Sequence, residues 1–452
     1  MTSDSSLSGS LFGPMFGAPD VDAGTSGVAW LQALLDVEAA LARAGASAGI
    51  VPAAAAEAIA QACVAGRFDP ADLARRAVDS ATVVIPLVAD LKALVPDDAK
   101  PYVHLGATSQ DIVDSAMSLV AKRVLTVVDD DLAACADRLA ALAREHRHTV
   151  QIGRTLLQQA LPTTFGAVCA GWLVALDEAR AGLSRVRAER LAVQLGGAVG
   201  TLASLGGHGP RVAGLLADSL GLAEPILPWH TARGRVAELA AALGVVAGTL
   251  ASVALDVTLL SQTEVAEVAE GTGGGSSAMP HKRNPARSVL VTACAHRVPG
   301  LVATVFAALP QEAQRAAGRW QAEWETVTEL LRLTGGAAYH SRALLAGLRV
   351  DPARMRANLD AGGGVVMAES AVGRLAGTMG RDRARAAVTA AARRARDEGR
   401  TLRDTLLDDA EVRAAIGPDE LDAALDPVGY LGAVDVFVDR ALRAHAAIGE
   451  AP

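Results

Sequence analysis

The sequence predicts an all-α protein, and three observations support this fold class. Aromatic residues make up only 3% of the 452 residues while alanine, leucine and valine dominate, a composition that suits closely spaced helices better than sheets. Hydrophobic residues reach 51%, enough for a sizeable core. The prolines leave long free stretches, at 102–161, 163–209, 229–279, 311–351 and 353–417. Because proline inside a helix costs about 3 kcal/mol, long helices are expected in these stretches.

Residues 1–112 are expected to form a first, smaller helical domain. Apolar residues recur at helical spacing between 30 and 41, and four prolines between 70 and 101 divide the sequence that follows. A pattern of short helices and loops fits this part of the chain better than one long helix.

Residues 113–363 are expected to form a central domain of long helices. The segment 107–152 contains neither proline nor glycine, and its apolar residues recur at steps of three and four. They are Met117, Val120, Val124, Val128, Leu132, Cys135, Leu139 and Leu142. Helices of about 30 residues far exceed the usual length of about 11, and their long apolar stripes suit a bundle shared between subunits. The sequence therefore predicts a homo-oligomer.

A glycine-rich stretch, AGGGV at 361–365, marks the expected boundary to a small C-terminal helical domain over 364–452. This last part is rich in arginine and alanine, and its end contains the segment DPVGYLG.

Charge and hydropathy exclude several classes of partner. The net charge is -8 and no basic tail is present, so a nucleic-acid partner is not expected. The most apolar run, 239–255, contains Thr249 and Ser252 and falls short of the roughly 20 residues that span a bilayer, so a buried helix is expected there. The N-terminus does not resemble a secretory signal, and the four cysteines have neither pairing nor metal-ligand spacing. These features predict a cytoplasmic protein that binds neither membrane nor metal.

The segment GTGGGSSAMPHKRNP at 271–285 is the strongest candidate for chemistry. Its spacing does not fit a phosphate-binding P-loop, which requires lysine directly after the last glycine and a preceding strand. The glycines permit hinge motion, and Ser276 lies six residues before Lys282. A serine hydroxyl can transfer a proton to or from carbon only where positive charge stabilises its alkoxide. Lys282 could supply that charge.

Three segments, in order along the chain, resemble the signature regions of the fumarase/aspartase superfamily. They read HLGATSQDIVDSA at 104–116, GRTLLQQALPTTFG at 153–166 and GSSAMPHKRNP at 275–285. The resemblance implies the three-domain fold of that superfamily, a central bundle of long helices that forms a homotetramer, and active sites shared between subunits. It also implies Ser276 as the catalytic base, contacts of Lys282 and Asn284 with a substrate carboxylate and the enolate-like intermediate, and a second carboxylate site at Thr108 and Ser109.

One departure from the pattern points to a branch of the superfamily. In the adenylosuccinate and argininosuccinate lyases the second region reads Gly-Arg-Thr-His, whereas this chain has Leu156 at the last position, which cannot donate a proton. The chain is more similar to the lactonising cycloisomerases of aromatic degradation, with which it shares QLGGAVGTLASLG, PWHTARGRVAE and QEAQRAAGRWQAEWETVTEL. Gly234 lies where those enzymes are expected to carry an aspartate.

The resemblance to cycloisomerases implies a small tricarboxylate substrate, 3-carboxymuconate, and no metal or organic cofactor. One carboxylate would attack the diene of its own molecule, Lys282 would stabilise the resulting aci-carboxylate, and Ser276 would protonate the adjacent carbon. Three negative charges require several donors in one cleft. The expected substrate-binding residues are His104, Thr108, Ser109, Arg154, Gln158, His230, Arg233, Arg235 and Asn284.

Two alternative functions stay open at this point. The first is an intermolecular lyase that releases fumarate from a succinyl adduct such as adenylosuccinate. Leu156, in place of the lyase histidine, argues against this function. The second is a structural oligomer with the same fold and no catalytic activity. The presence of Ser276, Lys282 and Asn284 argues against this alternative.

Overall fold

The computed structural model describes residues 11–271, 274–275 and 278–449, and the chain forms two compact units. The first unit contains Met1–Ala133, Glu178–Ala254 and Ser288–Ala343. The second contains Ala134–Asp177, Leu255–Arg287 and Leu344–Pro452. Five long helices contribute residues to both units. They are α7 (Ser109–Glu145), α8 (Phe165–Glu189), α10 (Gly234–Leu260), α11 (Ala286–Ala307) and α12 (Arg319–Ala346).

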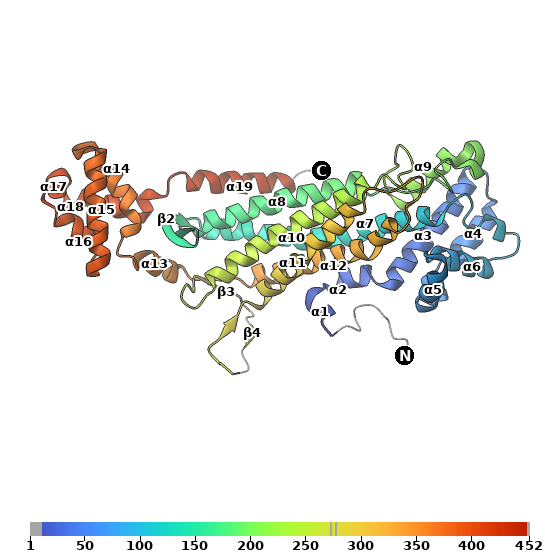
Figure 1. Cartoon of the computed structure of the whole chain (residues 1–452), viewed down its shortest axis with the longest axis horizontal. Coiled ribbons are helices and arrows are strands. Elements are labelled where there is room, and N and C mark those ends of the chain that lie inside the picture. Colours follow the sequence, from blue (N-terminus) through green and yellow to red (C-terminus); the bar gives the residue numbers. More distant parts are fainter. Residues whose placement is uncertain (1–10, 272–273, 276–277, 450–452) are drawn as a thin grey trace. The chain divides into compact units, whose positions relative to one another are not determined.

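The remaining elements of the first unit are short, apart from α3. They are α1 (Gly13–Phe16), α2 (Pro19–Gly24), α3 (Gly27–Ser47), α4 (Ala53–Ala62), η2 (Ala65–Arg67), α5 (Pro70–Ala77), η3 (Val78–Ser80), α6 (Val84–Leu94), η4 (Lys100–Tyr102), η5 (Ala203–His208) and α9 (Gly209–Leu220). The Ser26 hydroxyl caps α3 by accepting a hydrogen bond from the backbone N–H of Ala29 at 3.2 Å. This helix packs against both α4 and α9 (Figure 1).

The long helices of the first unit pack closely because small residues line several contacts. Val21 of α2 lies where a side chain at Gly335 of α12 would project, and Val302 of α11 lies next to Gly244 of α10. Arg342 of α12 and Arg180 of α8 donate to Asp131 and Asp129 of α7 at 2.9 and 3.3 Å. The predicted apolar stripe of α7 is buried along its whole length, from Met117 to Leu142.

The second unit combines short antiparallel strand pairs with a cluster of helices. The strands are β1 (Val150–Thr155) with β2 (Gln158–Thr164), β3 (Val268–Ala269) with β6 (Arg349–Val350), and β4 (Gly274–Gly275) with β5 (Arg283–Asn284). The helices are α13 (Pro352–Asp360), η6 (Val365–Met367), α14 (Ala368–Met379), α15 (Arg381–Glu398), α16 (Leu402–Leu407), α17 (Ala410–Ala415), α18 (Pro418–Leu425), η7 (Pro427–Tyr430) and α19 (Val434–Gly449).

The all-α prediction is confirmed, since strands are confined to these short pairs. The helices α14 to α18 enclose a hydrophobic core of their own, centred on Leu375, Val388, Leu402 and Leu421. Gly363 and Gly364 have positive φ values of 60° and 79°, so the AGGGV stretch forms the turn that precedes this cluster. The division at 1–112, 113–363 and 364–452 stays a prediction.

Within the described residues, two helices, α10 and α11, are long and apolar enough to cross a bilayer by length and composition alone. Only 44% of the most apolar stretch of α10 and 28% of that of α11 are buried.

Candidate active site

The loop before α7 carries the first group of candidate residues and is fixed by Asp111. The Asp111 carboxylate is fully buried, and its Oδ2 accepts hydrogen bonds from the backbone N–H groups of Thr108 and Gly197 at 3.0 and 2.9 Å. Its Oδ1 accepts from the backbone N–H of Gly196 at 3.1 Å. One buried carboxylate therefore caps α7 and ties the 104–109 loop to the 194–197 segment.

Three half-buried side chains of this loop present hydrogen-bonding groups: His104, Thr108 and Ser109. The Nδ1 atom of His104 lies 2.6 Å from Oε1 of Glu38. Within the described part of the chain, the hydroxyls of Thr108 and Ser109 have no hydrogen-bond partner. Two hydroxyls and one imidazole nitrogen are thus free to bind a ligand in the same loop.

His230, an expected substrate ligand, is instead buried behind this loop. Its Nε2 lies within hydrogen-bond distance of Asp111, and its backbone carbonyl accepts from Gln110 Nε2 at 2.8 Å. His230 therefore supports the loop within the first unit, where its side chain is 5% exposed, and its expected contact with substrate stays a prediction.

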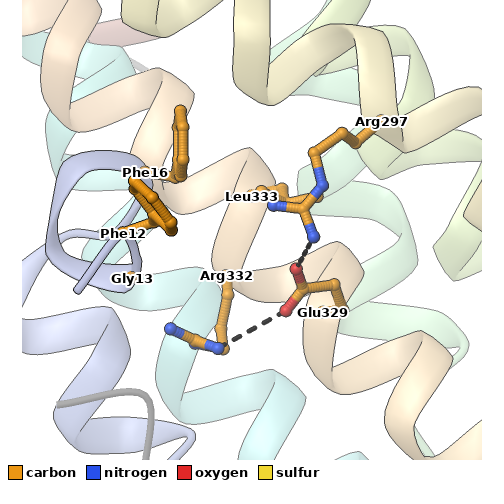
Figure 2. A pocket seen from close by; sticks show the side chains of 7 residues that line it. All are labelled: Phe12, Gly13, Phe16, Arg297, Glu329, Arg332 and Leu333. Carbon is orange, nitrogen blue, oxygen red and sulfur yellow. Dashed lines mark hydrogen bonds and ion pairs between the residues drawn. The ribbon is translucent and has the colours of Figure 1, made fainter. Parts of the chain in front are cut away.

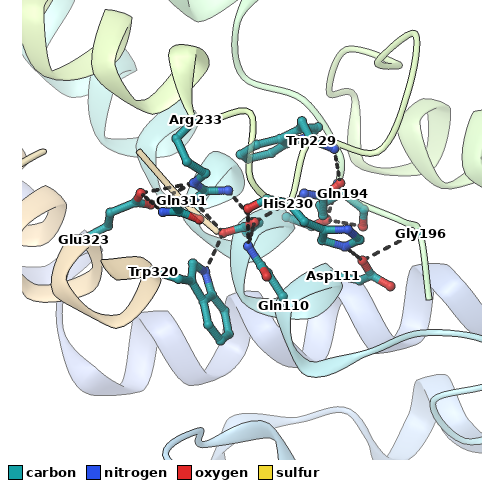
Figure 3. Close-up of polar contacts among 12 residues, drawn as sticks. Gln110, Asp111, Gln194, Gly196, Trp229, His230, Arg233, Gln311, Trp320 and Glu323 are labelled. Carbon is teal, nitrogen blue, oxygen red and sulfur yellow. Dashed lines mark hydrogen bonds and ion pairs between the residues drawn. The ribbon is translucent and has the colours of Figure 1, made fainter. Parts of the chain in front are cut away.

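Arg233, also expected to bind substrate, lies in a buried charge cluster (Figure 3). Its guanidinium donates to Asp114 at 2.7 and 3.0 Å and to Glu323 at 3.1 Å. Burial opposes the charged form, but the two carboxylates outweigh it and raise the pKa of Arg233 above its ordinary value. Since two buried carboxylates already pair with this cation, the geometry favours a structural role for Arg233, and its expected contact with substrate stays a prediction.

The surroundings complete the hydrogen bonding of this cluster. Trp320 Nε1 donates to Asp114 at 3.0 Å, and Gln311 Nε2 donates to Glu323 at 2.9 Å. The Trp229 ring lies 4.7 Å from the guanidinium carbon of Arg233, a cation–π contact. Arg315 donates to the Gly197 carbonyl, next to the same loop.

Arg235 also has another role than expected. Its guanidinium donates to the backbone carbonyls of Glu189 and Arg190 at 3.1 and 3.2 Å, at the C-terminal end of α8. Burial and the nearby Arg190 lower the pKa of Arg235. Arg235 therefore caps the C-terminal end of α8, and its expected contact with a substrate carboxylate stays a prediction.

In the second unit, Arg154 is held by a bidentate ion pair. Its guanidinium donates to the two oxygens of the buried Glu267 at 2.6 and 2.9 Å, and Asn358 donates to the same carboxylate at 2.8 Å. Arg154 keeps 24% of its side chain exposed, so one edge of the guanidinium can still meet a ligand. Gln158, on β2, is exposed.

The hairpin of β1 and β2 turns at Leu156 and Leu157, which have φ values of 51° and 62° and are 96% and 71% exposed. Two consecutive left-handed residues define a type I′ turn, for which asparagine and glycine are preferred. The residue that replaces the lyase histidine therefore projects from a strained turn.

The glycine-rich loop at 271–285 begins under tight packing. A side chain at Gly271 would meet the Gly347 carbonyl at 2.6 Å, so only glycine fits there. In the β4–β5 pair, Gly274 lies opposite Asn284, and Lys282 is exposed. Ser276, the expected catalytic residue, lies outside the described residues.

One pocket of about 190 Å³ lies elsewhere in the first unit (Figure 2). It is lined by Phe12, Gly13, Phe16, Arg297, Glu329, Arg332 and Leu333. Both arginines pair with Glu329, and Arg332 also donates to Asp22 at 3.1 Å, so their charges are balanced. Within the described ranges, no group of three or more histidine, cysteine, aspartate or glutamate side chains could hold a metal ion.

Sequence reasoning missed Glu38, which contacts His104, one of the expected substrate-binding residues. A signal was present, because Glu38 follows Leu31 by seven residues and Leu34 by four and so falls on the apolar stripe of α3. A carboxylate on such a stripe requires a buried partner, but the sequence does not say which.

The fold and these residues can now be compared with known proteins. The family model described as Lyase matches residues 23–300, and that of the adenylosuccinate lyase C-terminus matches 364–441. The chain belongs to the fumarase/aspartase superfamily of lyases. It is 47% identical to the 3-carboxy-cis,cis-muconate cycloisomerase of Pseudomonas aeruginosa, over 98% of both chains.

Other members of the superfamily are also similar over nearly the full length. The nitrosuccinate lyase of Streptomyces davaonensis is 42% identical, and 96% of this chain and 94% of that protein are covered. The crystal structure of the 3-carboxy-cis,cis-muconate lactonizing enzyme from Pseudomonas putida superposes with a TM-score of 0.92 at 44% identity, over 97% and 99% of the two chains.

Proposed function

We propose that this chain catalyses the cycloisomerisation of 3-carboxy-cis,cis-muconate to its lactone in the degradation of protocatechuate. The observation that carries the proposal is the near full-length identity of 44–47% to three 3-carboxy-cis,cis-muconate cycloisomerases. Leu156 adds chemical support, because an intramolecular ring closure has no leaving group that requires an external acid.

The reaction forms one carbon–oxygen bond and adds one proton to carbon. A substrate carboxylate attacks the diene, and the electron pair moves into the neighbouring carboxylate, giving an aci-carboxylate. Lys282 stabilises the added charge, and Ser276 then delivers a proton to the adjacent carbon. Because nucleophile and electrophile belong to one molecule, holding the diene in a curled conformation supplies much of the rate.

The placement of the arginines narrows the set of groups that hold the three carboxylates. Arg233 and Arg235 are committed within the first unit, and Arg154 is half neutralised by Glu267. Lys282 is therefore the main proposed cation for the substrate, and His104, which is paired with Glu38 through Nδ1, presents Nε2 as a donor, with hydrogen bonds from Thr108, Ser109 and Asn284. Gln158 and the exposed edge of Arg154 complete the proposed set.

We also propose that the active protein is a cytoplasmic homotetramer with active sites shared between subunits. Partly exposed apolar faces on α10 and α11 support the oligomer, with Val245 58% and Val289 55% exposed in the single chain. The buried thiols of Cys63, Cys135, Cys169 and Cys294 suit a reducing compartment.

The test follows loss of the diene's ultraviolet absorbance with 3-carboxymuconate. Wild-type protein should turn the substrate over, and Ser276→Ala should lower kcat by at least ~100-fold, as expected for a missing proton donor. The matched control is Ser370→Ala, at a half-buried serine of the second unit whose hydroxyl donates to the Ala424 carbonyl at 2.6 Å, and it should leave kcat unchanged. Release of fumarate from nitrosuccinate or adenylosuccinate faster than lactonisation would overturn the proposal in favour of an intermolecular lyase.

A further inference from the structure

Glu38 is a fully buried carboxylate that has no role in the proposed reaction as described above. Its side chain is 0% exposed, on the face of α3 that packs into the first unit. Oε1 lies 2.6 Å from Nδ1 of His104, while Oε2 is buried and has no hydrogen-bond partner within the described residues. Burying an isolated carboxylate is costly, so the His104 ring is the group that compensates its charge.

His104 is held in this contact by a strained backbone. Its φ is +63°, a left-handed conformation that is uncommon for residues other than glycine. Two residues on, Gly106 has a φ of +78°, and Leu205 fills the space where its side chain would project. The Asp111 carboxylate fixes the far end of the loop through the Thr108 N–H. Such strain persists only where the surroundings impose it, and it is common at functional sites.

The other edge of the His104 ring is left for a ligand. The side chain is 18% exposed, and within the described part of the chain Nε2 has no hydrogen-bond partner. The free hydroxyls of Thr108 and Ser109 belong to the same loop. The inner nitrogen is therefore anchored by a buried charge, and the outer nitrogen is available to an anion.

We propose that Glu38 is a positioning residue that keeps His104 protonated and oriented, so that Nε2–H donates to one carboxylate of the anionic substrate. The assignment deepens the proposed function and rests on it. An imidazolium binds a carboxylate more strongly than a neutral imidazole, because hydrogen bonds between charged groups are about twice as strong as neutral ones. Without Glu38, the ring would lose both its orientation and its charge at neutral pH.

The charges around the ring agree with this role. Burial alone lowers the pKa of His104, but the Glu38 carboxylate outweighs burial, and the net effect is a pKa above the ordinary histidine value. Asp111 of α7 adds to the rise, and Lys92 of α6 opposes it. Glu38 is the carboxylate in direct contact, so its removal should have the largest effect.

The experiment uses the full-length protein and a probe that cannot react, tricarballylate. Histidine ring signals are followed by NMR against pH in wild type, Glu38→Gln and Asp36→Asn, with His104→Gln to assign the His104 signal. Asp36 is a partly exposed carboxylate of the same helix that pairs with Arg123, and so serves as the matched control. Thermal unfolding of each variant reports whether it folds.

In wild type, the His104 signal should titrate above the ordinary histidine range and should shift on binding tricarballylate. In Glu38→Gln it should titrate at lower pH, and the Kd of tricarballylate at pH 7.5 should rise about fivefold, the difference of roughly 1 kcal/mol between a charged and a neutral hydrogen bond. Lowering the pH until the ring is protonated should restore binding, which a purely structural role of Glu38 would not produce. Asp36→Asn should match wild type.

A His104 pKa in wild type that does not exceed the ordinary histidine value would overturn the proposal without any variant. An equal Kd in wild type and Glu38→Gln, or a difference that is independent of pH, would also overturn it. These readouts need no turnover, so they separate this inference from the proposed function. Absence of lactonisation together with the expected titration would reject the reaction and keep the Glu38–His104 pair as an anion site.

Discussion

Arg233 shows how a single buried charge can fix several segments of the chain. Its guanidinium joins Asp114 of α7, Glu323 of α12 and the Trp229 ring, and all these groups are buried. A buried ion pair need not make a large net contribution to stability, yet removing one partner leaves uncompensated charge in the core. The cluster is therefore expected to act on folding and not on substrate binding.

Replacing Arg233 with methionine should lower the free energy of unfolding by about 3–5 kcal/mol, because two buried carboxylates lose their cation. Urea unfolding followed by circular dichroism at pH 7.5 measures the change. Arg374→Met, which removes an exposed pair with Glu420, is the control and should not differ measurably from wild type. A stable Arg233→Met protein with a raised KM would instead return Arg233 to the substrate site.

The Glu38–His104 pair also predicts how stability depends on pH. The folded-state pKa of His104 is raised above its unfolded value, so the pair's contribution is complete below the unfolded pKa and is lost as pH rises through the folded pKa. The difference in unfolding free energy between wild type and His104→Asn should therefore be largest near pH 6 and should shrink towards pH 9. Asparagine is chosen because it tolerates a φ of +63°. A difference that grows with pH would contradict the ion pair.

Among the elements, the β1–β2 hairpin combines strain with exposure. Left-handed backbone costs a residue such as leucine about 1–2 kcal/mol, and Leu156 and Leu157 also place apolar surface in water. Neither cost is explained by packing within the single chain. We therefore interpret the turn as a site of contact with substrate or with another copy of the chain.

The double variant Leu156→Asn, Leu157→Gly should raise the free energy of unfolding by about 1–2 kcal/mol, since it supplies the preferred residues of a type I′ turn. It should also lower kcat/KM about tenfold, equivalent to the loss of roughly 1.4 kcal/mol of apolar contact. Ala81→Gly relieves a φ of 50° in the first unit and should stabilise the fold without affecting turnover. If the double variant keeps full activity, the turn has no role in the reaction.

The elements differ in how far the sequence could predict them. The 37-residue α7 was predictable, because its glycine-free apolar stripe leaves no competing interpretation. The two-residue strands β3 to β6 were not, because they are too short to show a periodicity. The partners of Arg154 and Arg233 could not be predicted either. Glu267 and Glu323 lie 113 and 90 residues away along the chain, so only the folded structure shows that these arginines are neutralised.

At the scale of the whole molecule, the similarity to lyase-superfamily enzymes along nearly the full chain is stronger evidence for the family than any single contact. Long helices run through both compact units, and the match to cycloisomerase relatives extends over nearly all of them. The sequence could identify the superfamily from three short segments because each carries reactive or ligand-binding side chains. It could not place them in space, since each segment belongs to a different stretch of the fold.

The proposed homotetramer would cover apolar residues that are exposed on α10 and α11 in the single chain. Four chains of 46.1 kDa give a mass of about 184 kDa, which light scattering coupled to size exclusion should detect for wild type.

Val245→Arg combined with Val289→Arg places charge on these helices and should shift the mass towards smaller species. If the active sites are shared between subunits, as proposed, dissociation removes them, so kcat should fall in proportion to the tetramer lost, with little change in helix content. Val78→Arg, at a 79% exposed position on η3, is the control and should remain tetrameric. A wild-type protein that elutes at about 46 kDa with full turnover would show that one chain suffices.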